Sequence, residues 1–364
     1  MKNKPVIPIA CPTLPPKIKY FERISKIWQS HMLSNFSENA QEMENIVKEQ
    51  LENDSVAVVS GADIGLIISL SILKLPENSE VIVPAYTFNS TPNAILWNGL
   101  IPIFADIDAE TLTIDPKDVQ LKITKRTKAI LAVNTFGNPC KIDELRKIVQ
   151  KNGLFLIFDS ASSYGSSYKR KKVGNLGDIE VFSFSGTKIV SSAEGGAIVV
   201  NLPGLLEKIK MARNYGFLGD YNTKEMGING KISELNACLG CLTLPNIKKF
   251  VGHRNTLAKF YKTELTGVGD IEFQKVEKTN VSNYNDFVIL TSRSEDLQRF
   301  LENRGVQTKK YFFPIHKMDF YKKYYKELLV TDYIYKRCLT IPIYNNLKIL
   351  DQDYVIRKIK GFYK

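Results

Sequence analysis

Residues 182–188 read Phe-Ser-Phe-Ser-Gly-Thr-Lys, so a short apolar strand gives way to a small polar turn that ends in Lys188. The motif Glu194-Gly195-Gly196 follows closely, and upstream the apolar run 154–158 ends in Asp159. Short, continuous apolar runs of this kind are typical of strands buried on both faces of a parallel sheet. The stretch therefore predicts two strands of one sheet, each followed by a polar segment.

The same alternation of apolar strands and helices extends in both directions along the chain. The expected strands cover residues 56–60, 80–84, 101–104, 128–134, 154–159, 179–183 and 197–201, and the expected helices 64–74, 91–98, 142–152 and 203–213. This pattern predicts an α/β fold with a mainly parallel central sheet flanked by helices. Ligands gather at the carboxyl ends of the strands in such sheets. The residues at these ends, which we treat as one candidate site, are Ser60, Pro84, Asn134, Asp159 and Ser183.

The pattern changes past about residue 250. The later elements are expected to be a helix over 254–265, a strand over 286–292 and a helix over 295–304, followed by an aromatic and basic stretch. We therefore expect a large α/β domain over residues 1–249, with a Pro-rich lead-in and a helix over 37–52, and a smaller C-terminal α+β domain over residues 250–364. No low-complexity linker separates the two, so we expect them to be in close contact.

The composition is that of a globular protein. Of the 364 residues 44% are hydrophobic, which predicts a substantial core and argues against disorder. The start Met1-Lys2-Asn3-Lys4-Pro5 leads into a Pro-rich stretch rather than an apolar signal segment. The longest apolar run, Ile64 to Leu73, is too short to span a bilayer. These features favour a cytoplasmic protein without a membrane partner.

The five cysteines are scattered along the chain, and only Cys238 and Cys241 have CxxC spacing. No second pair and no nearby histidine completes a zinc site, and no strand precedes the motif as it would in a redox protein. We interpret these cysteines as small residues on a packed helix, and no metal site is expected.

The formal net charge of +12 is the best argument for a nucleic-acid binder. The basic residues are dispersed, however, with only short clusters such as Lys169-Arg170-Lys171-Lys172 and Lys309-Lys310. No zinc-finger, RNA-recognition or convincing helix-turn-helix pattern accompanies them. We therefore favour a small polyanion, such as a nucleotide diphosphate, as the target, and expect no nucleic-acid partner.

The residue types at the strand ends suggest one cofactor. Pyridoxal phosphate requires an amine for its aldehyde and a carboxylate that keeps its pyridine nitrogen protonated. Its phosphate prefers the N–H groups of a helix N-terminus, and its ring a flat side chain on one face. The sequence supplies Lys188, Asp159, the helix opening Gly61-Ala62-Asp63 with Ser183, and Phe88.

Motifs along nearly the whole chain strengthen this interpretation. They are Val83-Pro-Ala-Tyr-Thr-Phe88, Phe104-Ala-Asp-Ile-Asp108, Phe136-Gly-Asn-Pro-Cys140, Val173-Gly-Asn-Leu-Gly-Asp178, Phe182 to Lys188, Glu194-Gly-Gly196, Arg213-Asn-Tyr-Gly216, Gly227-Ile-Asn-Gly-Lys-Ile-Ser-Glu234, Pro314-Ile-His316 and Ile341-Pro-Ile-Tyr344. Each is weak alone, but in this order they are specific. With them the chain resembles the DegT/DnrJ/StrS family of nucleotide-sugar aminotransferases, which have the fold type I architecture of pyridoxal phosphate enzymes.

The resemblance implies a role for each candidate residue. Lys188 would bind the cofactor covalently and then move a proton between Cα of glutamate and C4′ of the cofactor. Asp159 would pair with the pyridine nitrogen. Ser183 and the backbone of Ala62 and Asp63 would hold the phosphate.

The resemblance also implies a homodimer with shared active sites. Asn229 would reach the phosphate of the cofactor in the neighbouring subunit. Phe88 would stack on the cofactor ring, and His316 would lie near the sugar or the dimer seam, with a purely structural hydrogen bond as the alternative. The FGNPC and GINGKISE motifs look most like those of enzymes that aminate C4 of dTDP-4-keto-6-deoxyhexoses, with L-glutamate as the amino donor, for O-antigen, capsule or related glycans.

Three positions depart from the family pattern. Ser162 stands where the family usually has Gln or His, which bonds the phenolic oxygen of the cofactor. Asp63 replaces the usual Thr of the phosphate turn, where an extra acid should repel the phosphate unless it turns away or caps the helix. Ser185-Gly186 replaces the commoner bulky-Pro pair.

Two alternatives therefore stay open beside the aminotransferase. One is a non-catalytic or regulatory family member with a weakened cofactor site. The other is a different pyridoxal phosphate reaction on a nucleotide sugar. Some relatives are sugar 3-dehydratases, which have His in place of the cofactor-binding lysine, and Lys188 argues against that reaction.

Overall fold

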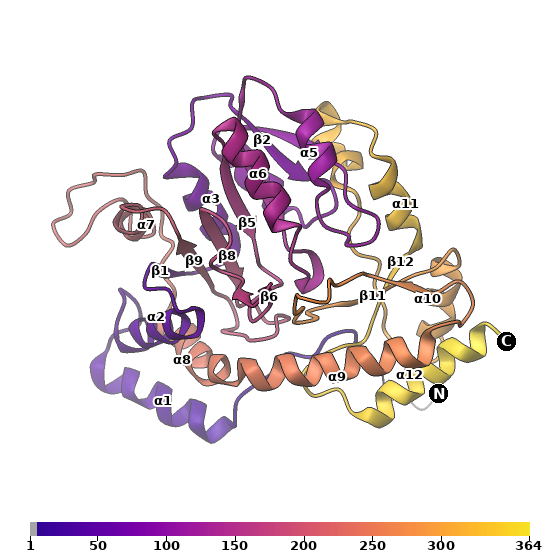
Figure 1. Cartoon of the computed structure of the whole chain (residues 1–364). Coiled ribbons are helices and arrows are strands. Elements are labelled where there is room, and N and C mark those ends of the chain that lie inside the picture. Colours follow the sequence, from indigo (N-terminus) through magenta and orange to yellow (C-terminus); the bar gives the residue numbers. More distant parts are fainter. Residues whose placement is uncertain (1–5) are drawn as a thin grey trace.

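The computed structural model describes residues 6–364, and its centre is a seven-stranded sheet (Figure 1). In spatial order the strands are β1 (Val56–Val59), β9 (Gly196–Val200), β8 (Ile179–Ser183), β5 (Phe155–Asp159), β4 (Thr127–Val133), β2 (Glu80–Pro84) and β3 (Ile101–Ala105). Only β9 runs antiparallel to its two neighbours, and the five strands from β8 to β3 pair in parallel. The expected mainly parallel sheet is confirmed.

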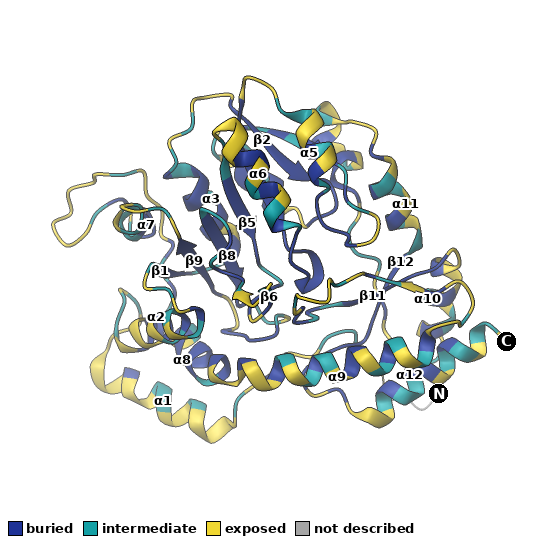
Figure 2. Ribbon diagram, in the orientation of Figure 1, coloured by how far each residue is buried: buried dark blue, intermediate teal, exposed yellow. Residues whose placement is uncertain are grey.

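Both faces of the sheet are buried, as the continuous apolar runs predicted (Figure 2). Successive residues of one strand point to opposite cores: Phe158 lies in one apolar cluster and Ile157 in the other. One face is covered by α2 (Glu38–Leu51), α5 (Pro116–Lys122), α6 (Ile142–Asn152) and α8 (Glu234–Thr243), and the other by α3 (Ala62–Ser71), α4 (Ser90–Trp97) and α7 (Leu206–Ala212).

Most expected elements lie within two or three residues of the observed ones, and β2, β8 and α6 have the expected bounds. Cys238 and Cys241 lie buried on α8, as interpreted from the sequence. The sequence did not predict several elements, which are α1 (Lys17–Ser30), α5, α11 (Leu329–Arg337), α12 (Ile349–Phe362), β10 (Glu272–Phe273), β12 (Cys338–Ile341) and the hairpin of β6 (Ser167–Tyr168) and β7 (Lys171–Lys172).

The C-terminal part has its own core. Antiparallel strands β10 (Glu272–Phe273), β11 (Phe287–Leu290) and β12 (Cys338–Ile341) pack with α9 (Ile247–Leu265), α10 (Ser294–Glu302) and α12 (Ile349–Phe362). Helix α9 begins at Ile247, so the boundary expected between residues 249 and 250 falls inside a continuous helix. The segment 315–328, with the 3₁₀ turns Ile315–Lys317 and Asp319–Tyr324, packs back onto the core of the large sheet.

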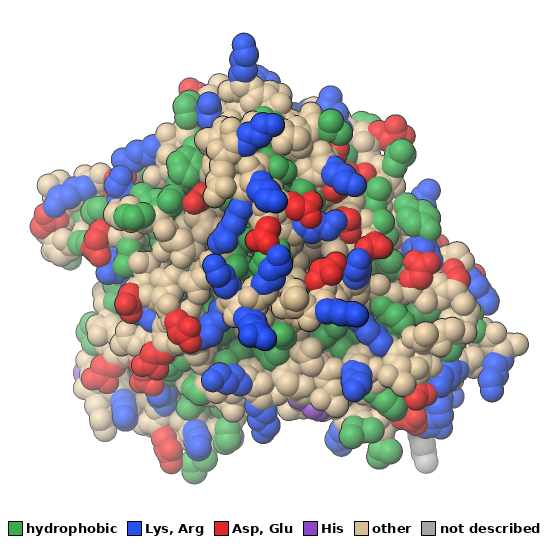
Figure 3. All heavy atoms as spheres, viewed as in Figure 1, with side chains coloured by type: hydrophobic (Ala, Val, Ile, Leu, Met, Phe, Trp, Pro, Cys, Tyr) green, Lys and Arg blue, Asp and Glu red, His purple; other side chains and the backbone are tan. Residues whose placement is uncertain are grey.

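The charged side chains are spread over the surface. Figure 3 shows Lys and Arg dispersed over the front face with Asp and Glu between them. This is the dispersed arrangement that the sequence predicted. Among the helices of residues 6–364, none has the length and apolar character needed to cross a membrane.

Two glycines let α3 approach the sheet closely. A Cβ on Gly65 would lie 2.7 Å from Cγ1 of Val181 on β8. A Cβ on Gly196, the first residue of β9, would lie 2.6 Å from the carbonyl oxygen of Phe182 and 3.0 Å from the backbone nitrogen of Ala62. The first helical residue of α3 is therefore held against the carboxyl end of β8.

We expect Gly196→Ala to lower the free energy of unfolding by about 1–3 kcal/mol, because its methyl group meets backbone atoms that cannot rotate away. Chemical denaturation measures the change. Gly252→Ala is the control: it lies within α9 with no atom near its added Cβ, and should stabilise the protein by up to about 1 kcal/mol. Equal stability of the two variants would contradict the packing described here.

Candidate active site

The carboxyl ends of five strands meet at one edge of the sheet. Strands β2, β4, β5 and β8 are parallel, and β1 points the same way because β9 is antiparallel to both β1 and β8. Ser183 pairs with Gly196, which in turn pairs with Val59. The edge expected from the sequence is therefore formed, with Asp159 ending β5 at its middle.

Asp159 is buried, with 5% of its surface exposed. Its Oδ2 accepts a hydrogen bond of 2.7 Å from the hydroxyl of Thr91, and its Oδ1 one of 3.0 Å from the backbone N–H of Ala161. Burial raises the pKa of Asp159, while these two hydrogen bonds and the charge of Lys188 act in the opposite direction. The carboxylate is thus held in place by donors on two different elements.

Lys188 lies in the turn after β8, where its N–H donates to the carbonyl of Ser185 at 3.0 Å. Its half-buried side chain places Nζ 3.1 Å from the hydroxyl oxygen of Ser162, three residues beyond Asp159. The structure therefore brings the predicted lysine, the predicted carboxylate and the unusual serine together.

The N-terminus of α3 completes one side of this group. Ser183 is buried at the end of β8, its hydroxyl accepts from the N–H of Ser185 at 3.3 Å, and Ala62 is held close by the packing at Gly196. Asp63, in the first turn of α3, is exposed. Burial is the main cause that raises the pKa of Asp159, and the charge of Asp63 adds to it. The acid expected at the phosphate turn therefore lies within electrostatic reach of the site.

Phe88 lies between β2 and α4, and 60% of its surface is exposed. Asn229 is exposed on the loop between α7 and α8, where it forms an isolated bridge with Asn214. This loop projects from the body of the molecule beside α7 (Figure 1).

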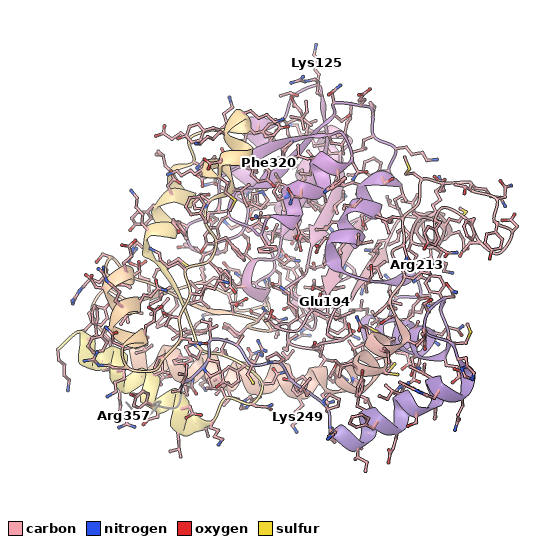
Figure 4. The ribbon with its side chains drawn as sticks, turned by 180° about the vertical axis from the view of Figure 1, so that it is seen from behind. Lys125, Glu194, Arg213, Lys249, Phe320 and Arg357 are labelled. Carbon is pink, nitrogen blue, oxygen red and sulfur yellow. The ribbon has the colours of Figure 1, made fainter. Side chains whose placement is uncertain are left out.

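Viewed from behind, Glu194 of the Glu-Gly-Gly motif lies near the middle of the molecule, and Arg213 lies to its side at the base of the loop (Figure 4).

His316 is placed differently from the other candidates. Its side chain is fully buried, with Nε2 3.3 Å from Oδ1 of Asp332 and the ring tilted against Tyr325. Burial lowers its pKa. Neither ring nitrogen has a hydrogen-bond partner within residues 6–364, so the role of His316 stays a prediction.

Sequence reasoning missed one part of the site. Thr87 and Thr91 lie on either side of Phe88, and their hydroxyl oxygens are 2.8 Å apart. Both residues are buried, and Thr91 bonds Asp159 directly. Their i,i+4 spacing across the start of a helix is the signal that could have found them.

The donor set of this edge fits pyridoxal phosphate. The Lys188 amine is bonded to Ser162, three residues after the buried Asp159 carboxylate, the N-terminus of α3 lies close to the strand-end residue Ser183, and the Phe88 ring is exposed. Asp63, in the first turn of α3, carries a charge of the wrong sign for a phosphate.

Comparison with known proteins agrees with this chemistry. The model of the DegT/DnrJ/EryC1/StrS aminotransferase family matches residues 17–360. GDP-perosamine synthase of Escherichia coli O157:H7 is 30% identical over 98% of both chains, and dTDP-4-amino-4,6-dideoxy-D-glucose transaminase of Escherichia coli is 32% identical over 98% of both. A crystal structure of DesI in the presence of its TDP-sugar product has a TM-score of 0.91 and 28% identity, covering 99% of this chain and 93% of that one.

The family match spans nearly the whole chain, and the fold and the site residues accompany it. The non-catalytic alternative is therefore set aside, and the chain is a pyridoxal phosphate-dependent enzyme. It belongs to the DegT/DnrJ/EryC1/StrS family of nucleotide-sugar aminotransferases.

Proposed function

We propose that this enzyme transfers the amino group of L-glutamate to C4 of a nucleotide-linked 4-keto-6-deoxyhexose, for O-antigen, capsule or a related glycan. The observation that carries the proposal is the Lys188 amine beside the buried Asp159 carboxylate at the carboxyl edge of the sheet. A relative named for a 4-amino-4,6-dideoxy sugar, similar over nearly the whole chain, supports the C4 position.

The nucleotide is the less constrained part of the substrate. We propose dTDP first, because the FGNPC and GINGKISE motifs favour it and two relatives are named for a dTDP sugar. GDP is the second candidate, since two others are named GDP-perosamine synthase.

In this proposal the residues of the site divide the chemistry among them. Bound pyridoxal phosphate supplies an electron sink for the carbon that exchanges its amino group. Lys188 anchors the cofactor and then serves as acid and base, taking the proton from Cα of glutamate in one half-reaction and delivering one to the sugar carbon in the other. Asp159 keeps the pyridine nitrogen protonated, and Ser162 orients the Lys188 amine through their hydrogen bond.

The remaining contacts hold the cofactor in place. Ser183 and the N–H groups of Ala62 and Asp63 bind the phosphate, because the N-terminus of a helix attracts anions. Phe88 covers one face of the ring.

We further propose a homodimer with shared active sites. Asn229 is exposed on a projecting loop that also exposes the apolar side chains of Tyr221 and Met226, and Trp28 on α1 is exposed as well. Large apolar side chains at exposed positions favour burial in an interface. In the dimer, Asn229 would contribute to the phosphate site of the partner subunit.

The first test is the absorbance spectrum of the protein with pyridoxal phosphate. The parent should show the visible band of a lysine-bound cofactor, and L-glutamate should bleach it. Lys188→Ala should lack that band, because the variant has lost the amine proposed to bind the cofactor. A dTDP- or GDP-linked 4-keto-6-deoxyhexose should then restore the band in the bleached parent. A parent without the band, or a Lys188→Ala variant that keeps it, would refute the proposed role of Lys188.

Asp63 offers a second test of the phosphate site. Asp63→Thr removes a carboxylate from the phosphate turn, so we expect it to tighten pyridoxal phosphate binding by roughly fivefold, corresponding to about 1 kcal/mol between two unit charges about 4 Å apart in water. Equilibrium dialysis of the apoenzyme measures the dissociation constant, and the gain should shrink as salt is added.

The matched control is Asp54→Asn. Asp54 is exposed and precedes β1, at the opposite edge of the sheet from the site. This variant removes the same charge without changing the phosphate turn and should leave the dissociation constant unchanged. Unchanged or weaker binding by Asp63→Thr would show that the Asp63 side chain turns away from the phosphate.

A further inference from the structure

Three buried side chains form a hydrogen-bonded series that leads from the start of α4 to the centre of the site. The hydroxyl oxygens of Thr87 and Thr91 are 2.8 Å apart, and the Thr91 hydroxyl is 2.7 Å from Oδ2 of Asp159. Thr91 is 0% exposed, Thr87 1% and Asp159 5%. Water therefore cannot take over any of these hydrogen bonds without a change in packing.

The available hydrogen-bond donors determine which group donates in each hydrogen bond of this series. An ionised carboxylate only accepts hydrogen bonds, so the single hydroxyl hydrogen of Thr91 points to Asp159. The contact between the two threonines then requires Thr87 to donate to Thr91. Hydrogen bonds in such a chain polarise one another, which strengthens the last bond to the charged group. Protonation of Asp159 would remove the negative charge that orients both hydroxyls and strengthens these hydrogen bonds.

The local backbone explains why these residues meet. The N–H of Thr91 donates to the carbonyl of Phe88 at 3.2 Å, which closes the first turn of α4. This turn places Phe88 outward and the two threonine hydroxyls inward, against the end of β5. The same turn therefore positions both Phe88, proposed to cover the cofactor ring, and Thr91, which bonds the Asp159 carboxylate.

Thr91 matters because the Asp159 carboxylate that it bonds is buried. Burial disfavours the charged form of Asp159 and raises its pKa, and the largest opposing contribution is the hydrogen bond from Thr91, followed by that from the N–H of Ala161. The N–H of Ala161 is fixed by the backbone, whereas the hydroxyl of Thr91 depends on one side chain. Pairing with a protonated pyridine nitrogen requires the ionised carboxylate.

We propose that Thr91, supported by Thr87, is a positioning residue that holds the Asp159 carboxylate ionised and oriented for the pyridine nitrogen of pyridoxal phosphate. The inference rests on the proposed role of Asp159 and adds the residues that make a buried carboxylate able to fill it. Thr91 itself acts through Asp159 and touches no reacting atom.

The test is the dissociation constant of pyridoxal phosphate for the apoenzyme, measured by equilibrium dialysis at a series of pH values from about pH 4, near the ordinary pKa of an aspartate carboxyl group, to about pH 8. Thr91→Val keeps the side-chain shape and removes the hydroxyl. Because hydrogen bonds to charged groups contribute most, binding at neutral pH should weaken about tenfold or more. Losing a bond to the charged form raises the pKa of Asp159 further, so the loss of binding at low pH should begin at a higher pH than in the parent.

Three comparison variants sharpen the result. Thr91→Ser retains the hydroxyl and should restore both affinity and pH profile. Thr87→Val should shift both in the same direction as Thr91→Val but less. Thr340→Val is the matched control, because the hydroxyl of Thr340 is buried without a hydrogen-bond partner in the described part of the chain, and this variant should bind as the parent does.

The outcomes separate this inference from the proposed function. Parent-like binding and pH profile in Thr91→Val, or equal losses in Thr91→Ser and Thr91→Val, would overturn the positioning role while leaving the Lys188 chemistry intact. If Thr91→Val does not fold, as judged by its thermal unfolding, Thr87→Val decides, and a parent-like profile there overturns the inference. Asp159→Asn tests the proposed role of Asp159 itself. Parent-like binding in that variant would refute this role, and the inference with it.

Discussion

A carboxylate buried at the end of β5 is the constraint on which the rest of the site depends. Asp159 is almost inaccessible to solvent, and burial alone would favour its neutral form. The fold counters this with donors from α4 and from the backbone after β5, and with the nearby Lys188 cation. A parallel sheet makes this possible because its strands deliver such groups to one edge while apolar residues fill both faces.

The second requirement is that a helix N-terminus approaches the same edge. Glycines at positions 65 and 196 let α3 lie close to β8 and β9, where any side chain would collide. The Glu-Gly-Gly motif after Lys188 is therefore explained by packing. In the proposed phosphate site, this packing would let the first N–H groups of α3 and the hydroxyl of Ser183 bind the same anion. The lysine turn, the carboxylate and this anion site together suit one cofactor.

Much of this arrangement could be predicted from the sequence, for a physical reason. Strands buried on both faces must be continuously apolar, so β2, β5 and β8 were found with nearly correct ends, and those ends marked the site. The reversed direction of β9 was not predicted, since a five-residue apolar run carries no directional signal. Helix α1 was missed although Ile18, Phe21, Ile24 and Trp28 recur at helical spacing; in this chain it buries only Ile27.

The contacts between side chains were harder to predict than the elements. Thr91 was placed on a helix, but its bond to Asp159 joins residues 68 positions apart and depends on how α4 packs on the sheet. His316 was expected near the sugar or the dimer seam, or in a structural hydrogen bond; its contact with Asp332 arises because segment 315–328 returns onto the large core. Long-range packing of this kind leaves no periodic pattern in the chain.

The central claim is that this enzyme moves nitrogen from glutamate to a sugar carbon. Its most direct test is incubation of the enzyme with ¹⁵N-labelled L-glutamate and dTDP- or GDP-linked 4-keto-6-deoxyhexoses, followed by mass spectrometry and NMR of the nucleotide sugar. Our account predicts a product with ¹⁵N bonded to C4 of the hexose and an equal amount of 2-oxoglutarate. A nucleotide sugar without ¹⁵N, or one that has lost a hydroxyl group instead, would contradict it.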